Sequence, residues 1–222
     1  MSMRTWAWVL AAALGTVACG DDGSGASGGG GAGGEGGGEG GAPPACAAET
    51  LCMDVVPAGA PAPGRLGVVW FRFEGTVGFD PTVAFDAPFD TTSTEIELPL
   101  SEIGLPPDVN LFCDRECEDT MTCPCVGTFR AGVAYVLVVT DVDASGAIDV
   151  AELAEPDNLV GIANTAVVWG SQESPIAPAP FDDIFPAGVH DGLDLHRITE
   201  GGAFEPAPEG VRFELRAGAG AL

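Results

Sequence analysis

Glycine and proline recur along the chain at short intervals, and they limit the length of every regular element. From residue 46 onward they interrupt the sequence repeatedly, and they favour turns. The segments between them are rich in β-branched and aromatic residues, which suit a pleated sheet. We therefore predict short strands at residues 65–73, 82–86, 94–100, 132–140, 163–169, 192–199 and 210–216.

Two of these segments indicate how the strands are placed. The segment 210–216 alternates between apolar residues such as Phe213 and charged residues such as Arg212, so one of its faces meets water. The segment 133–139 is apolar on both faces, which is typical of a strand in the centre of a sheet. The pattern predicts an all-β fold, a β-sandwich of the immunoglobulin-like or transthyretin-like kind, with one short helix near residues 149–154.

The first 18 residues have the form of an export signal. A single positive charge precedes an apolar run from Trp6 to Leu14, which is shorter than the ~20 residues of a membrane span. Residues 16–19 resemble the lipobox of bacterial lipoproteins, although Thr16 stands where leucine is preferred. The resemblance implies removal of residues 1–18 and a membrane anchor on lipidated Cys19. Ordinary secretion with a free thiol at the new N-terminus is the alternative.

The residues after Cys19 indicate a location and a domain boundary. Glycine follows Cys19 directly, whereas aspartate at that position is associated with retention at the inner membrane. The resemblance therefore favours the outer membrane of the cell envelope, on its periplasmic or its surface-exposed face. Residues 19–45 form a lipidated, glycine-rich flexible tether with a reach of roughly 25 to 30 Å. Residues 46–222 are long enough for one folded domain.

Six cysteines remain when Cys19 is set aside as the lipid carrier, and an even number in an exported protein favours disulfides. Six cysteines allow about 15 pairings, and the sequence does not choose among them. The pair at the start of the domain either closes on itself or joins the later group of four. That group has the donor atoms for zinc but not the spacing of a zinc ribbon. The disulfide candidates are Cys46, Cys52, Cys113, Cys117, Cys123 and Cys125.

One segment has the spacing of a calcium-binding loop of the EF-hand type. Its candidate ligands occupy positions 1, 3, 5, 7, 9 and 12, and a glycine at position 6 permits the sharp turn. We expect Ile148 to fix the loop, 141–152, to the core. The alternative is an acidic turn that holds no ion. The predicted Ca²⁺ ligands are Asp141, Asp143, Ser145, Ala147 (through its carbonyl), Asp149 and Glu152.

The context of the loop departs from an EF-hand, because a strand enters it and the sequence offers no second loop to pair with. It resembles the single EF-hand-type loops of β-rich extracellular modules. That resemblance implies a structural brace with a dissociation constant of about 10⁻⁴ to 10⁻³ M, and not a sensor.

The net charge of −25, with eight arginines and no lysine, opposes binding to nucleic acid. No nucleophile elbow, zinc-protease motif, phosphate loop or dinucleotide fingerprint occurs, so we do not expect an enzyme. Three scattered carboxylates, Asp80, Asp86 and Asp90, are the candidates for a hydrolase pair. We expect His190 and His196 to lie on the surface.

As a whole the chain resembles uncharacterised lipoproteins of Gram-negative bacteria, with a signal, a glycine-rich tether and a β-rich domain that carries one acidic calcium loop. The resemblance implies a non-enzymatic protein with a structural or interaction role, whose partner is an extracellular protein or a polysaccharide. One alternative is a carbohydrate- or peptide-binding module with Trp70 or Trp169 as its platform. The other is a hydrolase with an unrecognised carboxylate site.

Overall fold

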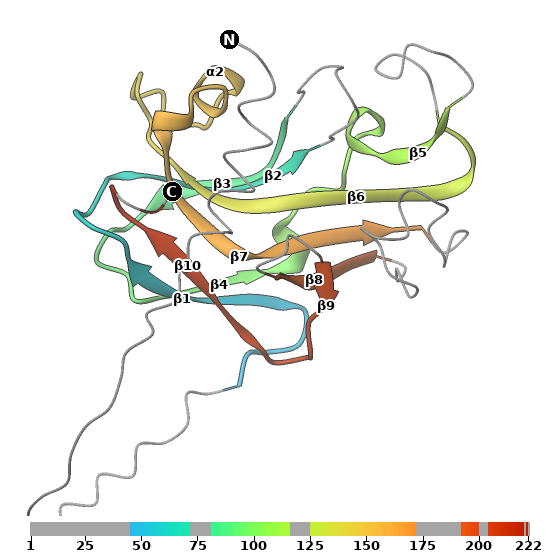
Figure 1. Ribbon diagram of the computed structural model, residues 1–222, viewed down its shortest axis with the longest axis horizontal. Coiled ribbons are helices and arrows are strands. Elements are labelled where there is room, and N and C mark those ends of the chain that lie inside the picture. The colour runs from blue at the N-terminus through green and yellow to red at the C-terminus, as the bar shows by residue number, and fades with distance from the viewer. Residues whose placement is uncertain are drawn as a thin grey trace, which may run out of the picture.

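The structure is a computed structural model that describes residues 45–71, 81–115, 125–171, 192–199, 204–219 and 221. Within these ranges the chain is mostly β, as predicted, and its strands form one ten-stranded sheet (Figure 1). The strands are β1 (Thr50–Pro57), β2 (Gly64–Phe71), β3 (Thr82–Phe89), β4 (Glu95–Pro99), β5 (Phe112–Arg115), β6 (Cys125–Val139), β7 (Leu159–Gly170), β8 (Gly192–Ile198), β9 (Phe204–Pro206) and β10 (Arg212–Ala217).

Helical structure in the described ranges is limited to short elements. The α-helix α2 spans Val150–Leu153, where the sequence predicted a short helix. Three 3₁₀ turns, η1, η2 and η3, span Leu100–Glu102, Asp108–Asn110 and Pro156–Asn158. None of the helices described is long and apolar enough to cross a membrane.

The sheet follows the order β3-β2-β6-β7-β10-β1-β4, with β5 added to β6 and with β8 and β9 added beyond β7. Strand β1 pairs with β10 in parallel, and the other pairs are antiparallel. In Figure 1 the long strand β6 crosses the molecule, with β2 and β3 above it and β7, β10, β1 and β4 below. The sheet therefore curls, and both of its faces become covered.

The two faces of β6 pack into two separate hydrophobic clusters. Tyr135 and Leu137 belong to the first cluster, whereas Val136 and Val138 belong to the second. This burial on both sides confirms the prediction of a central strand at 133–139. The second cluster also contains side chains of β1, β4 and β10, so the curled sheet closes over this face. The first cluster is covered in part by residues of the segment that follows β6.

The predicted strands are all present, and most of their described ends lie within a few residues of the predicted ones; the exception is β6, which begins at Cys125 and not at the predicted residue 132. The alternation expected for 210–216 is confirmed: Phe213 and Leu215 are buried in β10, while Glu214 and Arg216 are exposed. Three strands, β1, β5 and β9, were not predicted. The sequence of β1, TLCMDVVP, shows no alternation of burial, because Leu51, Cys52 and Met53 are buried one after another in a strand that lies between β4 and β10.

Two disulfides join the described cysteines, Cys46 to Cys52 and Cys113 to Cys125. The first pair thus closes on itself, and the second holds β5 against the start of β6. A zinc site built from four thiols is excluded, because two of those sulfurs bond to each other. The remaining candidates, Cys117 and Cys123, lie outside the described residues.

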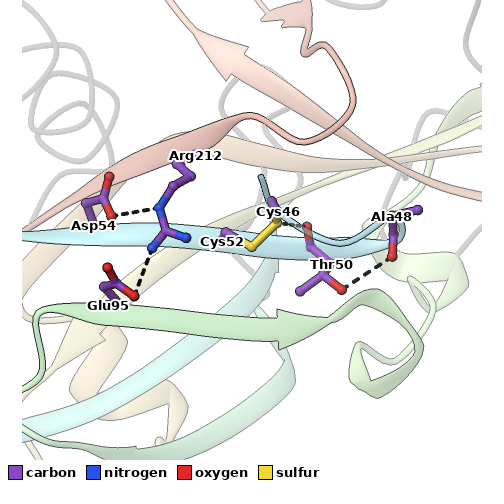
Figure 2. Close-up of a disulfide and its surroundings, with 7 residues drawn as sticks. All are labelled: Cys46, Ala48, Thr50, Cys52, Asp54, Glu95 and Arg212. Atoms are coloured by element: carbon purple, nitrogen blue, oxygen red, sulfur yellow. Dashed lines mark hydrogen bonds and ion pairs between the residues drawn. A yellow bond between two sulfur atoms is a disulfide. The ribbon is translucent and has the colours of Figure 1, made fainter. Parts of the chain in front are cut away.

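The first disulfide lies beside a cross-strand ion pair at the edge of the sheet (Figure 2). Arg212 of β10 contacts Asp54 of β1 at 2.9 Å and Glu95 of β4 at 3.6 Å. The hydrogen bond to Asp54 raises the pKa of Arg212 above its ordinary value. One cation therefore bridges three adjacent strands next to the point where the domain begins.

Candidate metal centre

The predicted calcium loop connects the end of β6 to α2, and hydrogen bonds hold both of its ends. The backbone N–H of Thr140 donates to the carbonyl of Asn158 at 2.8 Å, and the Asn158 side chain donates to the carbonyl of Glu152 at 3.2 Å. At the far end, the Asp149 carboxylate accepts from the Glu152 N–H at 2.8 Å, and Glu152 accepts from the Asp149 N–H at 3.3 Å. This reciprocal capping starts α2.

Three carboxylates converge inside this loop. Asp141, Asp143 and Glu152 each offer an oxygen, and these oxygens lie within 4.8 Å of one another. Oxygens that share one Ca²⁺ at 2.3 to 2.6 Å lie at most about 5 Å apart, so the observed spacing is short enough for a common ion. Asp143 is exposed, Asp141 is half-buried, and Glu152 is only 5% exposed. The group could hold a metal with one side open to solvent.

Backbone amides of the loop turn the carboxylates inward. The N–H of Ser145 donates to Asp141 at 3.0 Å and to Asp143 at 2.9 Å. The N–H of Gly146 donates to the second oxygen of Asp141 at 3.0 Å, and the N–H of Val142 donates to Glu152 at 2.6 Å. These bonds require a tight backbone path, in which Gly146 adopts a φ of 79°, a conformation that favours glycine.

Hydrogen bonds from Ser145 affect the ionisation of Asp143. Bonds from the side chain and then the backbone of Ser145 hold the pKa of Asp143 below its ordinary value. The carboxylate therefore stays charged at neutral pH despite the two neighbouring acids. An ionised oxygen donor is the form that a hard divalent cation binds.

The other predicted ligands take different positions. The Ser145 hydroxyl lies 3.0 Å from the carbonyl oxygen of Ala147, so the oxygens at positions 5 and 7 of the loop are adjacent. Asp149 is exposed, caps α2, and is not part of the group formed by the three carboxylates. This placement suits a contact to an ion through water, one of the two roles expected for position 9 of such a loop.

The loop is fixed to the sheet by apolar packing, as predicted for Ile148. Ile148 is 7% exposed and Leu153 of α2 is 1% exposed, and both belong to the first hydrophobic cluster. Gly67 of β2 leaves room for this contact, because a Cβ atom there would lie 2.5 Å from the Cδ1 atom of Ile148. The acidic loop is thus continuous with the core of the domain.

A contact that the sequence did not reveal adds a polar attachment. The backbone N–H of Ile148 donates to the carboxylate of Asp86 on β3 at 3.1 Å. The other oxygen of Asp86 accepts from Arg65 of β2 at 2.6 Å. Asp86 was a candidate for a hydrolase pair, but here both of its oxygens have structural partners. Its separation of 62 residues from Ile148 leaves no local signal for the contact.

Those of the remaining candidate residues that the structure describes do not assemble into a second site. Asp90 accepts from Thr92 within its own turn, and Asp80 lies outside the described residues. The surface position expected for His196 is wrong: this residue is 2% exposed, because β8 lies between β7 and β9. His190 lies outside the described residues.

Of the two tryptophans proposed as a binding platform, Trp70 is buried and Trp169 is only partly exposed. Trp70 is fully buried, and its indole N–H donates to the carbonyl of Gly104 at 2.8 Å. Trp169 is partly buried against the second cluster. Among the described residues the exposed large hydrophobic side chains are Leu105, Val142 and Val150, and none of them is aromatic.

Comparison with protein-family models, with curated proteins and with solved structures finds no match for this chain. The chemistry of the loop must therefore be argued from its own residues.

Proposed function

We propose that the protein is a non-enzymatic lipoprotein of the outer membrane, anchored through Cys19, whose β-sandwich domain is braced by one Ca²⁺ bound in the loop 141–152. The observation that carries the proposal is the convergence of three carboxylates within 4.8 Å on a loop whose middle and far end are packed into the core. Because the loop packs against the core, an ion that holds the loop in its native conformation also stabilises the sheet. The curled sheet, with its two hydrophobic clusters, supports the sandwich architecture.

The donor set favours Ca²⁺ over other metals. Asp141, Asp143 and Glu152 supply hard oxygen donors, and Ser145 and Ala147 place two further oxygens side by side. Zinc and the later transition metals prefer nitrogen and sulfur, which these residues do not offer. Magnesium requires a nearly ideal octahedron and retains several waters, whereas Ca²⁺ accepts six to eight oxygens in an irregular shell.

The bracing role follows from electrostatics and from burial. Three carboxylates at close range repel one another, and a divalent cation reverses that repulsion. Glu152 links the ion to the fold, because its nearly buried side chain also caps α2. In the unfolded chain these groups are dispersed, so the ion binds the native state preferentially and stabilises it by mass action.

The location in the envelope is supported by covalent chemistry. Disulfides persist in oxidising compartments outside the cytoplasm, and two are formed by the described cysteines. The bond between Cys46 and Cys52 ties the first residues of the domain to β1, next to the tether. We expect the domain to serve as a surface structural or interaction module whose partner is an extracellular protein or a polysaccharide.

Two measurements test the proposal. Growth with labelled palmitate should label the wild-type chain, and the Cys19→Ser variant should remain unlabelled and leave the membrane fraction. Titration of the oxidised chain with Ca²⁺ should give one site with a dissociation constant of about 10⁻⁴ to 10⁻³ M. If the chain binds no Ca²⁺ at 10 mM, the proposed calcium brace is refuted. If the wild-type chain is not labelled, the proposed lipid anchor is refuted.

A further inference from the structure

The carboxylate of Asp86, on β3, contacts both the neighbouring strand β2 and the loop 141–152, and each of its oxygens has a different partner. One oxygen accepts from the Nε atom of Arg65 at 2.6 Å, and the other accepts from the backbone N–H of Ile148 at 3.1 Å. The side chains of Arg65 and Asp86 are only 13% and 20% exposed. The ion pair therefore holds the carboxylate in one orientation, with its second oxygen directed at the loop.

The partner of Asp86 in the loop is part of a peptide group that also carries a candidate ligand. The N–H of Ile148 and the carbonyl of Ala147 belong to the same planar peptide unit. In a trans peptide these two bonds point in opposite directions. The hydrogen bond to Asp86 therefore directs the Ala147 carbonyl away from β3. On that side the carbonyl oxygen lies 3.0 Å from the hydroxyl of Ser145, the neighbouring candidate ligand.

The hydrogen bond also affects the electron density of the peptide group. An anionic acceptor on the N–H polarises the unit and increases the negative charge on its carbonyl oxygen. A more negative oxygen is a better ligand for a hard cation. Side-chain packing of Ile148 against Gly67 fixes the same peptide unit from its apolar side, so the carbonyl has little freedom to turn.

We propose that Asp86 is a positioning residue for the metal centre. It orients and polarises the Ala147 carbonyl as a ligand, and Arg65 holds Asp86 in place for this task. The inference rests on the proposed binding of Ca²⁺ by the loop 141–152, and it extends the metal centre to two strands, β2 and β3. The Ca²⁺ affinity then depends on two residues, Asp86 and Arg65, that precede Ile148 in the sequence by 62 positions or more.

The test compares Ca²⁺ affinities of variants of the full oxidised chain by calorimetry at about 0.15 M salt. Asp86→Ala should weaken binding about 10- to 100-fold, the usual effect of removing a partner of a ligand. The control Asp90→Ala removes the same charge near the end of β3, where Asp90 bonds only within its own turn. Its affinity should change less than about twofold, since exposed charges at a distance are screened.

Arg65→Gln separates positioning from simple electrostatics. Removal of a positive charge near a cation site should strengthen Ca²⁺ binding if Coulomb interaction alone acts. If Arg65 instead holds Asp86 in place, the same variant should weaken binding by a factor of about 3 to 10. Tighter binding by Arg65→Gln overturns the proposal, and so does equal affinity in the wild type and in Asp86→Ala.

A spectroscopic readout reports on the ligand itself. In the wild type, Ca²⁺ should shift the carbonyl ¹³C resonance of Ala147, and this shift should be reduced in Asp86→Asn, which keeps the shape of the side chain. If Asp86→Ala does not fold, Asp86→Asn decides the matter, with an expected loss of about threefold in affinity. A wild type that binds no Ca²⁺ refutes the proposed function. A wild type that binds normally, with unchanged Asp86 variants, refutes only the positioning role.

Discussion

Replacement of Asp143 by asparagine should reduce the stabilisation by calcium without damaging the fold, because a neutral amide oxygen is a weaker ligand for a hard cation than a carboxylate. Asp143 is exposed, and its contacts in the described structure lie within the loop. Asparagine at this position keeps an oxygen for the N–H of Ser145 but removes one of the three clustered charges. In chelator the Asp143→Asn variant should melt at the wild-type temperature or slightly below it, because the ionised carboxylate, whose pKa the bonds from Ser145 hold below its ordinary value, accepts stronger hydrogen bonds than an amide does.

The magnitude for the wild type follows from the expected affinity. With a dissociation constant of about 10⁻⁴ to 10⁻³ M, 10 mM free Ca²⁺ stabilises the native state by about 1.4 to 2.7 kcal/mol. For a domain of about 180 residues, 1 kcal/mol shifts the melting temperature by about 2 to 4 °C. The wild type should therefore gain about 3 to 11 °C from calcium relative to chelator.

The assay is a calorimetric melt of the oxidised chain in 10 mM Ca²⁺ and in excess chelator. A matched control is Asp157→Asn, which removes one exposed carboxylate on η3 outside the group of three clustered carboxylates. This variant should retain the full increase in melting temperature from calcium, the calcium increment. The reasoning is refuted if Asp143→Asn keeps the full increment, or if Asp157→Asn loses as much of it as Asp143→Asn does. A wild type that gains nothing from calcium would show that the clustered carboxylates form only a turn.

Three further outcomes are expected. Burial raises the pKa of Tyr135 to about 12. The phenolate absorbance of this single tyrosine should therefore rise near pH 12 in the folded state. A titration midpoint near pH 10 would contradict its burial. Because this folded-state pKa is raised, stability should fall as the pH rises above about 10, where tyrosine in the unfolded chain begins to ionise. Ile148→Ala should lower the free energy of unfolding in chelator by about 2 to 4 kcal/mol, measured with urea, and a change below 1 kcal/mol would show that the loop is not packed into the core. The double variant Cys46→Ser, Cys52→Ser should lose about 2 kcal/mol from the short loop that this bond closes, and unchanged urea stability would show that the bond constrains little.

Local patterns predicted much of the sheet and the three clustered carboxylates of the candidate metal centre. Alternation in β10 identified its buried face, and continuous apolarity identified β6 as central. The spacing of Asp141, Asp143 and Glu152 anticipated that they converge. These predictions succeed because the interactions involved act over about a dozen residues, within which backbone geometry determines which side chains meet.

Contacts between distant segments could not be predicted. Alternation shows which face of a strand is buried but not which strand lies beside it. The bridge from Arg212 to Asp54 joins residues 158 positions apart. Similarly, the burial of His196 depends on β7 and β9, and no property of its neighbours in sequence signals it.

The sequence by itself determined the strand-rich character of the chain, the oxygen-rich loop, and the short helix that follows this loop and begins with a capping box. Only the tertiary structure decided which cysteines pair among the described ones, where the sheet curls, and that Asp86 reaches the amide of Ile148. The physical reason is that short-range order follows from backbone stereochemistry and residue type. The choice among distant partners depends instead on the packing of the whole sheet, which minimises exposed apolar surface and unpaired polar groups together.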